Sequence, residues 1–373
     1  MAWSWNDVNV AAGAGDSGVG GPEISAYVFA PQGTQHVIYG SGFEGQIHEL
    51  WCDGGGWHFN NLTTTANAPA SVGGTAQAYP FNEQVTQHVV YIGNADFDVH
   101  ELWWDNHGWH HNDLTTATGV PSGLGLGPGE SEPAGYVFAS QGTQHVNYRR
   151  DDDGHVIELW WDTTGWHFND LTLAACATDV PNSGVVGYAF DAQATQHVLY
   201  GRNDGHIIEL WWGSGAWNYH DLTAATGAPL AYGEYAMGAS GYVFSAQGTQ
   251  HVNYLGEDFH IHELWWDGSG WHHNDLSNAS GAGPANYNAF PVGYVFAAQG
   301  TQHVNYLGPD SHIHELWWDV NGWHHNDLTL ASGAPVSDSA FCIPVGYSFD
   351  AKGTQHVFYR DDNLHVTQVT WTP

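Results

Sequence analysis

The chain has 373 residues and a formal net charge of −34 at pH 7, because 39 acidic side chains are balanced by only five Lys and Arg. Binding to nucleic acid or to an anionic membrane surface requires Lys and Arg, so neither is expected as a partner. The 20 Trp, 18 Tyr and 48 Gly favour short strands joined by tight turns over long helices.

The first segment, MAWSWNDVNVAAGAG, has neither the basic region nor the apolar stretch of a signal peptide, and no apolar run in the sequence is long enough to span a bilayer. We therefore expect a soluble protein without membrane insertion that is cytoplasmic on synthesis, with non-classical release to the exterior left open. Cys52, Cys176 and Cys342 are too widely spaced for a disulfide framework or a C-x-x-C metal site, and we expect buried thiols.

A repeat of about 53 residues dominates the sequence. Its marker, Thr-Gln-His, occurs seven times, with histidines at His36, His88, His145, His197, His251, His303 and His356. The fullest copy, Gly241 to Leu276, contains four strand-like segments, GYVFSA, TQHVNYL, HIHELWWD and GWHHNDL, separated by turn signals. The pattern predicts an all-β fold: a seven-bladed β-propeller, with four antiparallel strands per blade, that spans residues 1–373 as a single domain.

The two ends of the chain complement each other. The seventh copy stops without a segment equivalent to GWHHNDL, whereas WSWNDV at residues 3–8 matches WHHNDL at residues 109–114. The N-terminal segment is therefore predicted to supply the outermost strand of the last blade. That strand closes the ring and removes its open sheet edges.

Alternation along HIHELWWD places a carboxylate and an indole on one face, because residues two apart in a strand share a face. Glu263 and Trp265 lie together, opposite His262 and Trp266. A carboxylate accepts hydrogen bonds from neighbouring sugar hydroxyls, and an indole covers the apolar face of a pyranose. With the rim Trp of GWHHNDL, the predicted carbohydrate-binding residues are Glu49, Trp51, Trp57, Glu101, Trp103, Trp109, Glu158, Trp160, Trp166, Glu209, Trp211, Trp217, Glu263, Trp265, Trp271, Glu315, Trp317 and Trp323.

Other repeated residues have a structural interpretation. The second tryptophan of each pair, such as Trp104, is expected in the contact between blades, and aspartates such as Asp113 are expected to bond to the backbone of a turn. The Thr-Gln-His triplets are expected to satisfy buried polar groups. The last copy has Gln368 and Val369 at the positions of the carboxylate and the first tryptophan, so its site is expected to be weak or absent. The loop from residue 118 to 134 is longer than its counterparts and is a candidate contact surface.

The string GYVFAAQGTQHVNY, followed by HIHELWWD and GWHHNDLT, resembles the repeat of the PLL-like bacterial lectins, the seven-bladed propellers typified by those of Photorhabdus. The resemblance covers essentially the whole chain. It implies binding of L-fucose, and in some members galactose or O-methylated sugars, on cell-surface glycans at sites between blades, with assembly into dimers or tetramers. The repeat is less closely similar to that of six-bladed fungal fucose lectins, which also have an acid and a tryptophan in each blade.

Two alternatives involve catalysis and metal binding. An enzyme requires one constellation that differs from the rest, whereas the acids recur once per blade, so no catalytic residue and no cofactor are expected. His260 and His262 are two residues apart, as are His312 and His314, and each pair could share a face as metal ligands. An isoleucine replaces the second histidine in the third and fourth copies, which argues against a metal repeated in every blade.

A scaffold for protein–protein interaction is the remaining alternative, because fold alone does not determine function. Scaffolds usually have divergent loops and one divergent face. This chain repeats its polar and aromatic groups nearly identically, which favours many copies of one small ligand and hence a multivalent lectin.

Overall fold

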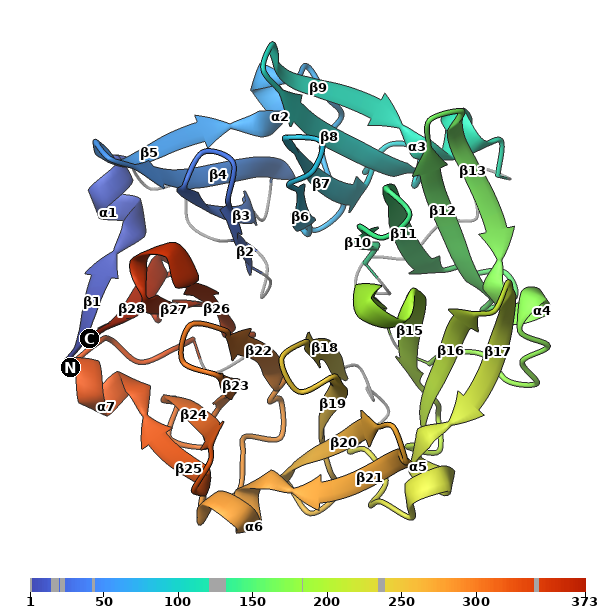
Figure 1. Ribbon diagram of the computed structural model, residues 1–373. Coiled ribbons are helices and arrows are strands. Elements are labelled where there is room, and N and C mark those ends of the chain that lie inside the picture. The colour runs from blue at the N-terminus through green and yellow to red at the C-terminus, as the bar shows by residue number, and fades with distance from the viewer. Residues whose placement is uncertain are drawn as a thin grey trace.

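A computed structural model describes residues 2–14, 20, 24–41, 44–120, 132–182, 184–233, 239–338 and 342–373. It contains seven antiparallel four-stranded sheets arranged as a ring (Figure 1). In each of the first six blades the strand that comes first in the sequence lies nearest the centre and the fourth lies at the rim. The predicted seven-bladed propeller is therefore confirmed. Most of the long loop that was a candidate contact surface, residues 121–131, lies outside the described residues.

The strand bounds follow the repeat. Blade 1 consists of β2 (Ile24–Phe29), β3 (Thr34–Ser41), β4 (Gln46–Asp53) and β5 (Gly56–Asn61). Blade 2 consists of β6 (Gln77–Phe81), β7 (Thr86–Ile92), β8 (Val99–Asp105) and β9 (Gly108–Asp113). Blade 3 consists of β10 (Ala134–Phe138), β11 (Thr143–Arg149), β12 (Val156–Asp162) and β13 (Gly165–Asp170). Blade 4 consists of β14 (Val185–Phe190), β15 (Thr195–Gly201), β16 (Ile207–Gly213) and β17 (Ala216–Asp221).

The remaining blades repeat this order. Blade 5 consists of β18 (Ser240–Phe244), β19 (Thr249–Leu255), β20 (Ile261–Asp267) and β21 (Gly270–Asp275). Blade 6 consists of β22 (Val292–Phe296), β23 (Thr301–Leu307), β24 (Ile313–Asp319) and β25 (Gly322–Asp327). Blade 7 consists of β26 (Val345–Phe349), β27 (Thr354–Arg360), β28 (Val366–Thr372) and β1 (Ala2–Asp7).

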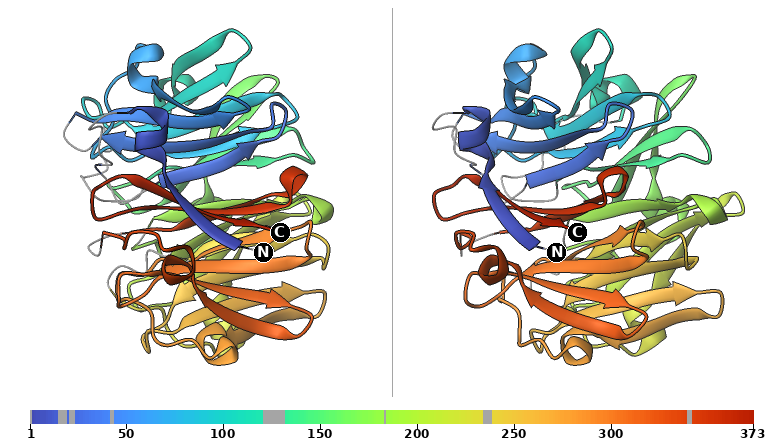
Figure 2. Two further views of the ribbon diagram at one scale, coloured as in Figure 1. Left: turned by 90° about the vertical axis from the view of Figure 1, so that its left-hand side faces the viewer. Right: turned by 60° about the vertical axis from the view of Figure 1, so that its left-hand side comes forward.

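The N-terminal strand closes the ring. Strand β1 pairs antiparallel with β28, with Trp3 opposite Trp371. Both termini therefore lie together at the rim of blade 7 (Figure 2). The prediction for residues 3–8 is confirmed, except that the strand ends at Asp7 and Val8 begins a helix.

A short helix follows the outer strand of each blade and was not predicted. The helices are α1 (Val8–Ala12), α2 (Leu62–Thr65), α3 (Leu114–Thr118), α4 (Leu171–Ala174), α5 (Leu222–Thr226), α6 (Leu276–Ser280) and α7 (Leu328–Ser332), and two 3-10 turns are η1 (Asp191–Gln193) and η2 (Asp350–Lys352). Each helix follows an Asp or Asn that caps it; the side chain of Asp113, for example, accepts a hydrogen bond of 2.8 Å from the backbone N–H of Thr116. The predicted turn role of the aspartates is thus confirmed. Within the described ranges, no helix has the length and apolar character needed to cross a bilayer.

Adjacent blades pack through large side chains. Between blades 1 and 2, Ile47 of β4 belongs to the same buried cluster as Leu102 of β8, with Trp104 and Trp109 packed against it. Trp104 of blade 2 contacts Phe29 of blade 1 edge to face, with ring centroids 5.9 Å apart. The inter-blade role predicted for the second tryptophan is confirmed at this boundary.

A ring of hydrogen bonds joins every blade to the next. The hydroxyl of Tyr27 in blade 1 donates to Oε1 of Gln87 in blade 2 at 2.8 Å, and both groups are buried. Burial raises the pKa of Tyr27 well above its ordinary value, so the phenol remains a neutral donor. The tyrosine hydroxyl also donates at Tyr79–Gln144, Tyr136–Gln196, Tyr188–Gln250, Tyr242–Gln302 and Tyr347–Gln35, over 2.9 to 3.3 Å. At the remaining boundary Nε2 of Gln355 donates to the hydroxyl oxygen of Tyr294 at 2.6 Å. The predicted structural role of the Thr-Gln-His glutamine is confirmed.

The cysteines differ from one another in burial. Cys342 is buried, Cys52 is half-buried and Cys176 is exposed. The expectation of buried thiols is therefore wrong for Cys176, because this residue lies in the turn after α4, at the rim, with a left-handed backbone (φ 52°). The three remain free thiols.

Candidate functional site

The six predicted glutamates lie beneath the surface, only 1% to 3% exposed. In blade 2, Oε1 of Glu101 lies 2.8 Å from Nδ1 of His88, and Nε2 of the same histidine lies 2.8 Å from Oγ1 of Thr86. The same Thr–His–Glu chain occurs in blades 1 to 6, with Nδ1–Oε1 distances of 2.8 or 2.9 Å. Each glutamate therefore shares its carboxylate with the histidine of Thr-Gln-His. The threonine and histidine of the triplet thus form hydrogen bonds with buried polar groups, as predicted.

The tryptophan two residues after the glutamate lies nearer the surface, and in five blades it stacks on a histidine of the outer strand. Trp265 on β20 and His272 on β21 stand opposite each other, with ring centroids 4.4 Å apart and planes 30° from parallel. The centroid distances are 4.2 to 4.4 Å in five blades, at Trp51–His58, Trp103–His110, Trp160–His167, Trp265–His272 and Trp317–His324. In blade 4 an asparagine, Asn218, stands opposite Trp211. The stack forms a flat, half-exposed aromatic surface.

A carboxylate holds each of these histidines. Nε2 of His272 lies 3.2 Å from Oδ1 of Asp267, and both side chains are more than one-third exposed. Hydrogen bonds from His110 and from the backbone of His107 lower the pKa of the equivalent Asp105 to about 2, so it is ionised at neutral pH. The histidines and their aspartates were not among the predicted site residues. The signal was present, because a histidine usually follows the rim tryptophan.

The two faces of a blade contribute to different boundaries. Tyr27, His36 and Trp51 stand opposite one another across three strands and share a face. Because Tyr27 bonds to blade 2, this face of blade 1 is turned toward blade 2. The rim tryptophan of blade 1, Trp57, lies on the other face and contacts Phe358 of blade 7, with centroids 6.1 Å apart. A boundary therefore combines the glutamate and first tryptophan of one blade with the second and rim tryptophans of the next.

This arrangement regroups the predicted residues. Glu49 and Trp51 face the same boundary as Trp109 of blade 2, and the rim tryptophan of their own blade faces away from them. The sixth set, Glu315 and Trp317, is completed by the N-terminal strand, whose Trp3 belongs to the cluster between blades 6 and 7. Six boundaries carry the full combination of carboxylate, first tryptophan and rim tryptophan.

The seventh boundary, between blades 7 and 1, departs from this pattern. Strand β28 pairs with β27 so that Val369 stands opposite Val357 and Thr370 stands opposite His356. Thr370 therefore occupies the position of the first tryptophan. The prediction that Val369 occupies it is wrong, because Val369 is fully buried at the position of the leucine that lies between the glutamate and the tryptophan in the other blades. Gln368 does replace the glutamate, with Nε2 3.0 Å from Nδ1 of His356.

The strands on either side of β28 and across the boundary also differ from those of the other boundaries. Ser4 of β1 stands opposite Thr370, where five of the other blades have the stacked histidine. Across the boundary, Cys52 of blade 1 takes the place of the second tryptophan and stands opposite Trp57. The aromatic stack is thus absent from this boundary among the described residues.

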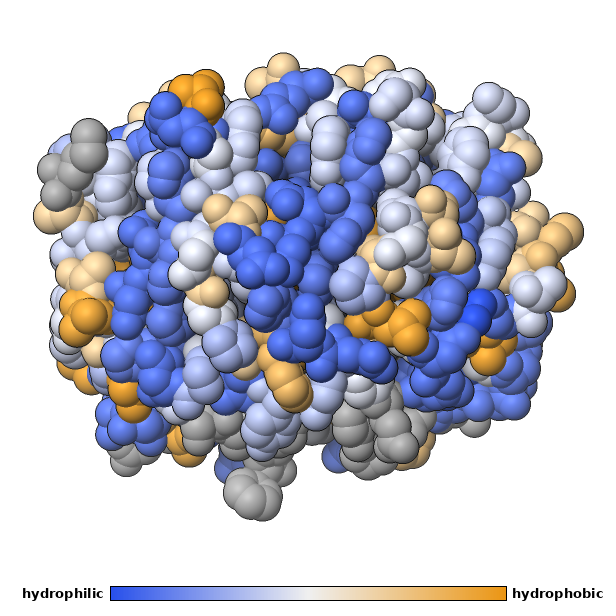
Figure 3. Space-filling view, turned by 90° about the horizontal axis from the view of Figure 1, so that it is seen from below, coloured by the Kyte–Doolittle hydropathy of each residue, from blue (hydrophilic) through white to orange (hydrophobic). Residues whose placement is uncertain are grey.

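One side of the ring is shown in Figure 3. Hydrophilic residues dominate it, and hydrophobic residues form small separate groups. Single exposed hydrophobic residues such as Val320 and Leu330 are ordinary on a protein surface. The coloured residues of this side thus form no broad apolar patch of the kind that protein partners cover.

Neither a protein-family profile nor a curated protein sequence matches the chain. Solved structures do match its fold. A complex of the SapL1 lectin with α-methyl fucoside is 17% identical, with a TM-score of 0.56 over 84% of this chain and 97% of that one. AofleA from Arthrobotrys oligospora is 15% identical, with a TM-score of 0.55 over 87% and 89%. A mutant Aleuria aurantia lectin in complex with Fucα1-6GlcNAc is 13% identical, with a TM-score of 0.54 over 95% and 93%. At these identities the similarity establishes the fold.

Proposed function

We propose that this chain is a non-enzymatic lectin that binds L-fucose and related sugars at the boundaries between its blades. One observation carries the proposal: a tryptophan stacked on a polar side-chain partner, above a buried glutamate, recurs in near-identical settings around the ring. The sugar class is supported by two solved lectins of matching fold that hold α-methyl fucoside and Fucα1-6GlcNAc. The repeat's resemblance to the Photorhabdus lectins extends the candidate ligands to galactose and O-methylated sugars.

The side chains at a boundary have complementary tasks in this proposal. The indole of Trp265 packs on the apolar C–H face of the sugar, and the rim tryptophan of the next blade, Trp323, forms the opposite wall. The ring nitrogens of His272 and the carboxylate of Asp267 hydrogen-bond to hydroxyls. Oε1 of Glu263 is bonded to Nδ1 of His251, so we propose that the other carboxylate oxygen, Oε2, accepts a hydrogen bond from a sugar hydroxyl. The bond to His251 also holds the glutamate in place beneath Trp265.

The absence of catalysis is part of the proposal. Glycoside hydrolysis uses a pair of carboxylates at one site with distinct environments. Here the acids occupy equivalent environments in blade after blade, each bonded to the same histidine of its repeat. We propose that sugar binding at these boundaries uses no cofactor.

Repetition compensates for weak individual sites. A monosaccharide offers few atoms, so each site is expected to bind with a Kd of roughly 1 mM to 1 µM, about −4 to −8 kcal/mol. Several sites on one rigid ring raise the avidity for a glycan-covered surface by about 10²- to 10⁴-fold. We propose that the whole chain acts as one domain, that it assembles into dimers or tetramers, and that it agglutinates cells bearing fucosylated glycans after non-classical release.

A glycan array with labelled, tag-free protein tests the proposal, followed by calorimetric titration of the best monosaccharide. The expected result is a set of fucosylated hits and several equivalent sites per chain. Circular dichroism of the same sample establishes that the protein is folded. A blank array from folded protein would contradict the lectin proposal and favour the protein-interaction scaffold.

A further inference from the structure

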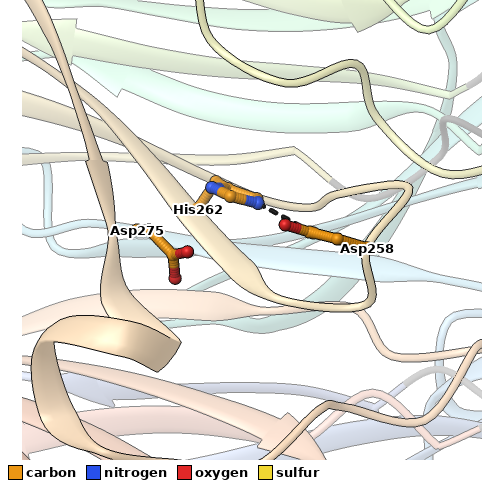
Figure 4. A group of neighbouring side chains, drawn as sticks. All are labelled: Asp258, His262 and Asp275. Carbon is orange, nitrogen blue, oxygen red and sulfur yellow. Dashed lines mark hydrogen bonds and ion pairs between the residues drawn. The ribbon is translucent and has the colours of Figure 1, made fainter.

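A cluster of histidines and aspartates occurs at the end of blade 5 opposite the β20–β21 turn. Asp258 comes from the loop between β19 and β20, His262 from β20 and Asp275 from the end of β21 (Figure 4). These three residues each offer an oxygen or nitrogen atom within 4.8 Å of the others. A fourth, His260, places Nδ1 2.9 Å from Oδ2 of Asp275 and 3.8 Å from Oδ2 of Asp258.

Blade 6 repeats the cluster. Nδ1 of His312 lies 2.8 Å from Oδ2 of Asp327, and Nε2 of His314 lies 3.1 Å from Oδ1 of Asp310. Here Asp310, His312 and Asp327 are the three that offer atoms within 4.8 Å of one another. The two blades therefore have the same four side chain types at these positions, two imidazoles and two carboxylates, although the set of three atoms that all lie within 4.8 Å of one another includes the second histidine in blade 5 and the first one in blade 6.

Three contacts in blade 5 come close to the spacing of ligand atoms around a tetrahedral metal ion. With metal–ligand bonds of about 2.0 to 2.1 Å, neighbouring ligand atoms in a tetrahedron lie about 3.3 Å apart. In blade 5 the separation from Nε2 of His262 to Oδ1 of Asp258 is 3.0 Å, and the two contacts of His260 bracket the ideal value. The other carboxylate oxygen of Asp275 caps α6 through the backbone N–H of Asn278, which fixes the orientation of that carboxylate. Nδ1 of His262 lies 3.0 Å from Nε2 of His273, a second-layer contact that orients the imidazole.

In blades 3 and 4, the guanidinium group of an arginine lies beside the equivalent aspartates. In blade 4, Arg202 forms an ion pair with Asp204, and its Nη1 lies 3.9 Å from Oδ2 of Asp221. Asp204 and Asp221 are equivalent to Asp258 and Asp275 of blade 5. The equivalence follows from the backbone, since the N–H of Arg202 donates to the carbonyl of His206 at 2.9 Å, as the N–H of Gly256 does to that of His260. Ile208 stands in β16 where His262 stands in β20.

Blade 3 has the same exchange. Arg150 forms an ion pair with Asp153 and lies 3.9 Å from Oδ2 of Asp170, and Ile157 takes the position of the second histidine. Blades 3 and 4 thus have an arginine and an isoleucine at the two positions where blades 5 and 6 have a glycine and a histidine.

The glycine of blade 5 leaves room for the second histidine. A Cβ atom at Gly256 would lie 2.5 Å from Cδ2 of His262 and 2.7 Å from Oδ1 of Asp258, so a side chain there requires the imidazole or the carboxylate of the cluster to move. The only basic residues of the chain are Arg149, Arg150, Arg202, Lys352 and Arg360, so none is present between residues 203 and 351. The first histidine is common to all four blades, since His155 and His206 lie 2.8 Å from the equivalent aspartates. The carboxylate pairs of blades 5 and 6 therefore differ in having one imidazole more and no guanidinium, and imidazoles are preferred ligands of divalent transition metals.

We propose that blades 5 and 6 each bind one divalent first-row transition-metal ion of the zinc class, through Asp258, His260, His262 and Asp275 and through Asp310, His312, His314 and Asp327. The ion takes the place that a guanidinium holds in blades 3 and 4. The sequence argument against a metal in every blade remains compatible with this proposal, because the sites belong to two blades. They lie at the opposite end of each blade from the aromatic platform, so metal binding is independent of sugar binding.

Zinc titration of the full-length protein, tag-free and stripped with a chelator, tests the proposal. The titration is performed in imidazole buffer, which suppresses binding to single surface histidines. The expected stoichiometry is two ions per chain by calorimetry, confirmed by elemental analysis after gel filtration, with a rise in the unfolding temperature because the ion binds only the folded state. A stoichiometry below one ion per chain would overturn the proposal.

The sister blades supply matched variants. The double change Gly256→Arg with His262→Ile gives blade 5 the residues of blade 4, and Gly308→Arg with His314→Ile does so in blade 6. Each is expected to remove one zinc equivalent, and both together should remove two. His272→Ala, at the sugar-binding end, is expected to keep both ions. If a double variant does not fold, Asp258→Asn replaces it as a nearly isosteric loss of one ligand. Two ions retained by folded variants altered in both blades would contradict the proposal.

Discussion

The indole of Trp265 and the imidazole of His272 stack across β20 and β21, with ring centroids 4.4 Å apart. The stack makes the tryptophan a rigid platform, since its partner is held in turn by Asp267. A rigid aromatic surface loses little conformational freedom when a sugar docks on it. The boundary between blades 5 and 6 is therefore the clearest place to test the proposed function.

Replacing Trp265 with alanine is expected to remove one sugar site and leave the others intact. The substitution deletes the platform of one boundary, and the remaining boundaries have their own tryptophans. Calorimetry with α-methyl fucoside should show one equivalent fewer per chain at unchanged affinity. Val320→Ala, at a side chain that is 90% exposed, is the control and should bind like the wild type. Complete loss of binding by a folded Trp265→Ala protein would contradict independent sites.

The boundary between blades 7 and 1 is expected not to bind fucose. It has Thr370 and Ser4 in place of the stacked pair, and Cys52 in place of the second tryptophan. Saturating titration should therefore give about six sites per chain, one for each boundary that carries the first tryptophan, and Trp317→Ala should reduce the number to about five. Seven equivalent sites would show that the first tryptophan is not required.

Acid is expected to destabilise the last blade through His356. Burial, with a smaller contribution from Lys352, lowers the pKa of this imidazole from 6.5 to about 4. Between these values the unfolded chain binds the proton and the folded chain does not, so the free energy of unfolding falls as the pH drops from about 6.5 to 4. The shift corresponds to at most about 3 kcal/mol.

Urea unfolding at pH 7 and pH 4.5 measures this effect. The difference in stability between the two pH values should be smaller for His356→Gln than for the wild type, because the variant cannot gain the proton. His107→Gln, at an imidazole that is 84% exposed, is the control and should show the wild-type difference. An unchanged difference in His356→Gln would mean that other groups account for the acid sensitivity.

Removing one hydroxyl from the inter-blade ring is expected to weaken the fold. Tyr188→Phe leaves the buried Oε1 of Gln250 without its donor at 3.0 Å, which should cost about 1 to 3 kcal/mol of unfolding free energy. Urea denaturation measures the loss. Tyr287→Phe, at a side chain that is 62% exposed, should leave stability unchanged. Equal stability of the Tyr188→Phe protein would show that water replaces the tyrosine hydroxyl.

Much of the fold was predictable because its signals are local. The Thr-Gln-His spacing predicted seven blades, and the match between residues 3–8 and 109–114 predicted the closing strand. The short helices were not predicted, because four or five residues after an Asp cap carry little periodicity. The assignment of Val369 was wrong because a one-residue shift in register exchanges the faces of a strand.

The candidate site was predictable in composition and less so in arrangement. Alternation placed Glu263 and Trp265 on one face, and the structure keeps them there. The partner of the glutamate, His251, comes from a different strand, and no spacing within HIHELWWD indicates it. Nor does that spacing show that the rim tryptophan, Trp271, faces blade 4 while Trp265 faces blade 6.

The sequence by itself determined the number of blades, their four strands, the closure by the N-terminus and the face on which each repeated side chain lies, because repeat length and alternation are properties of the covalent chain. Only the tertiary structure decided which faces meet. It also decided that the Thr-Gln-His imidazoles occupy one oxygen of each buried glutamate, and that glycine with histidine in blades 5 and 6 replaces arginine with isoleucine in blades 3 and 4. These relationships depend on register and on packing between blades, where contacts form among residues far apart in the chain.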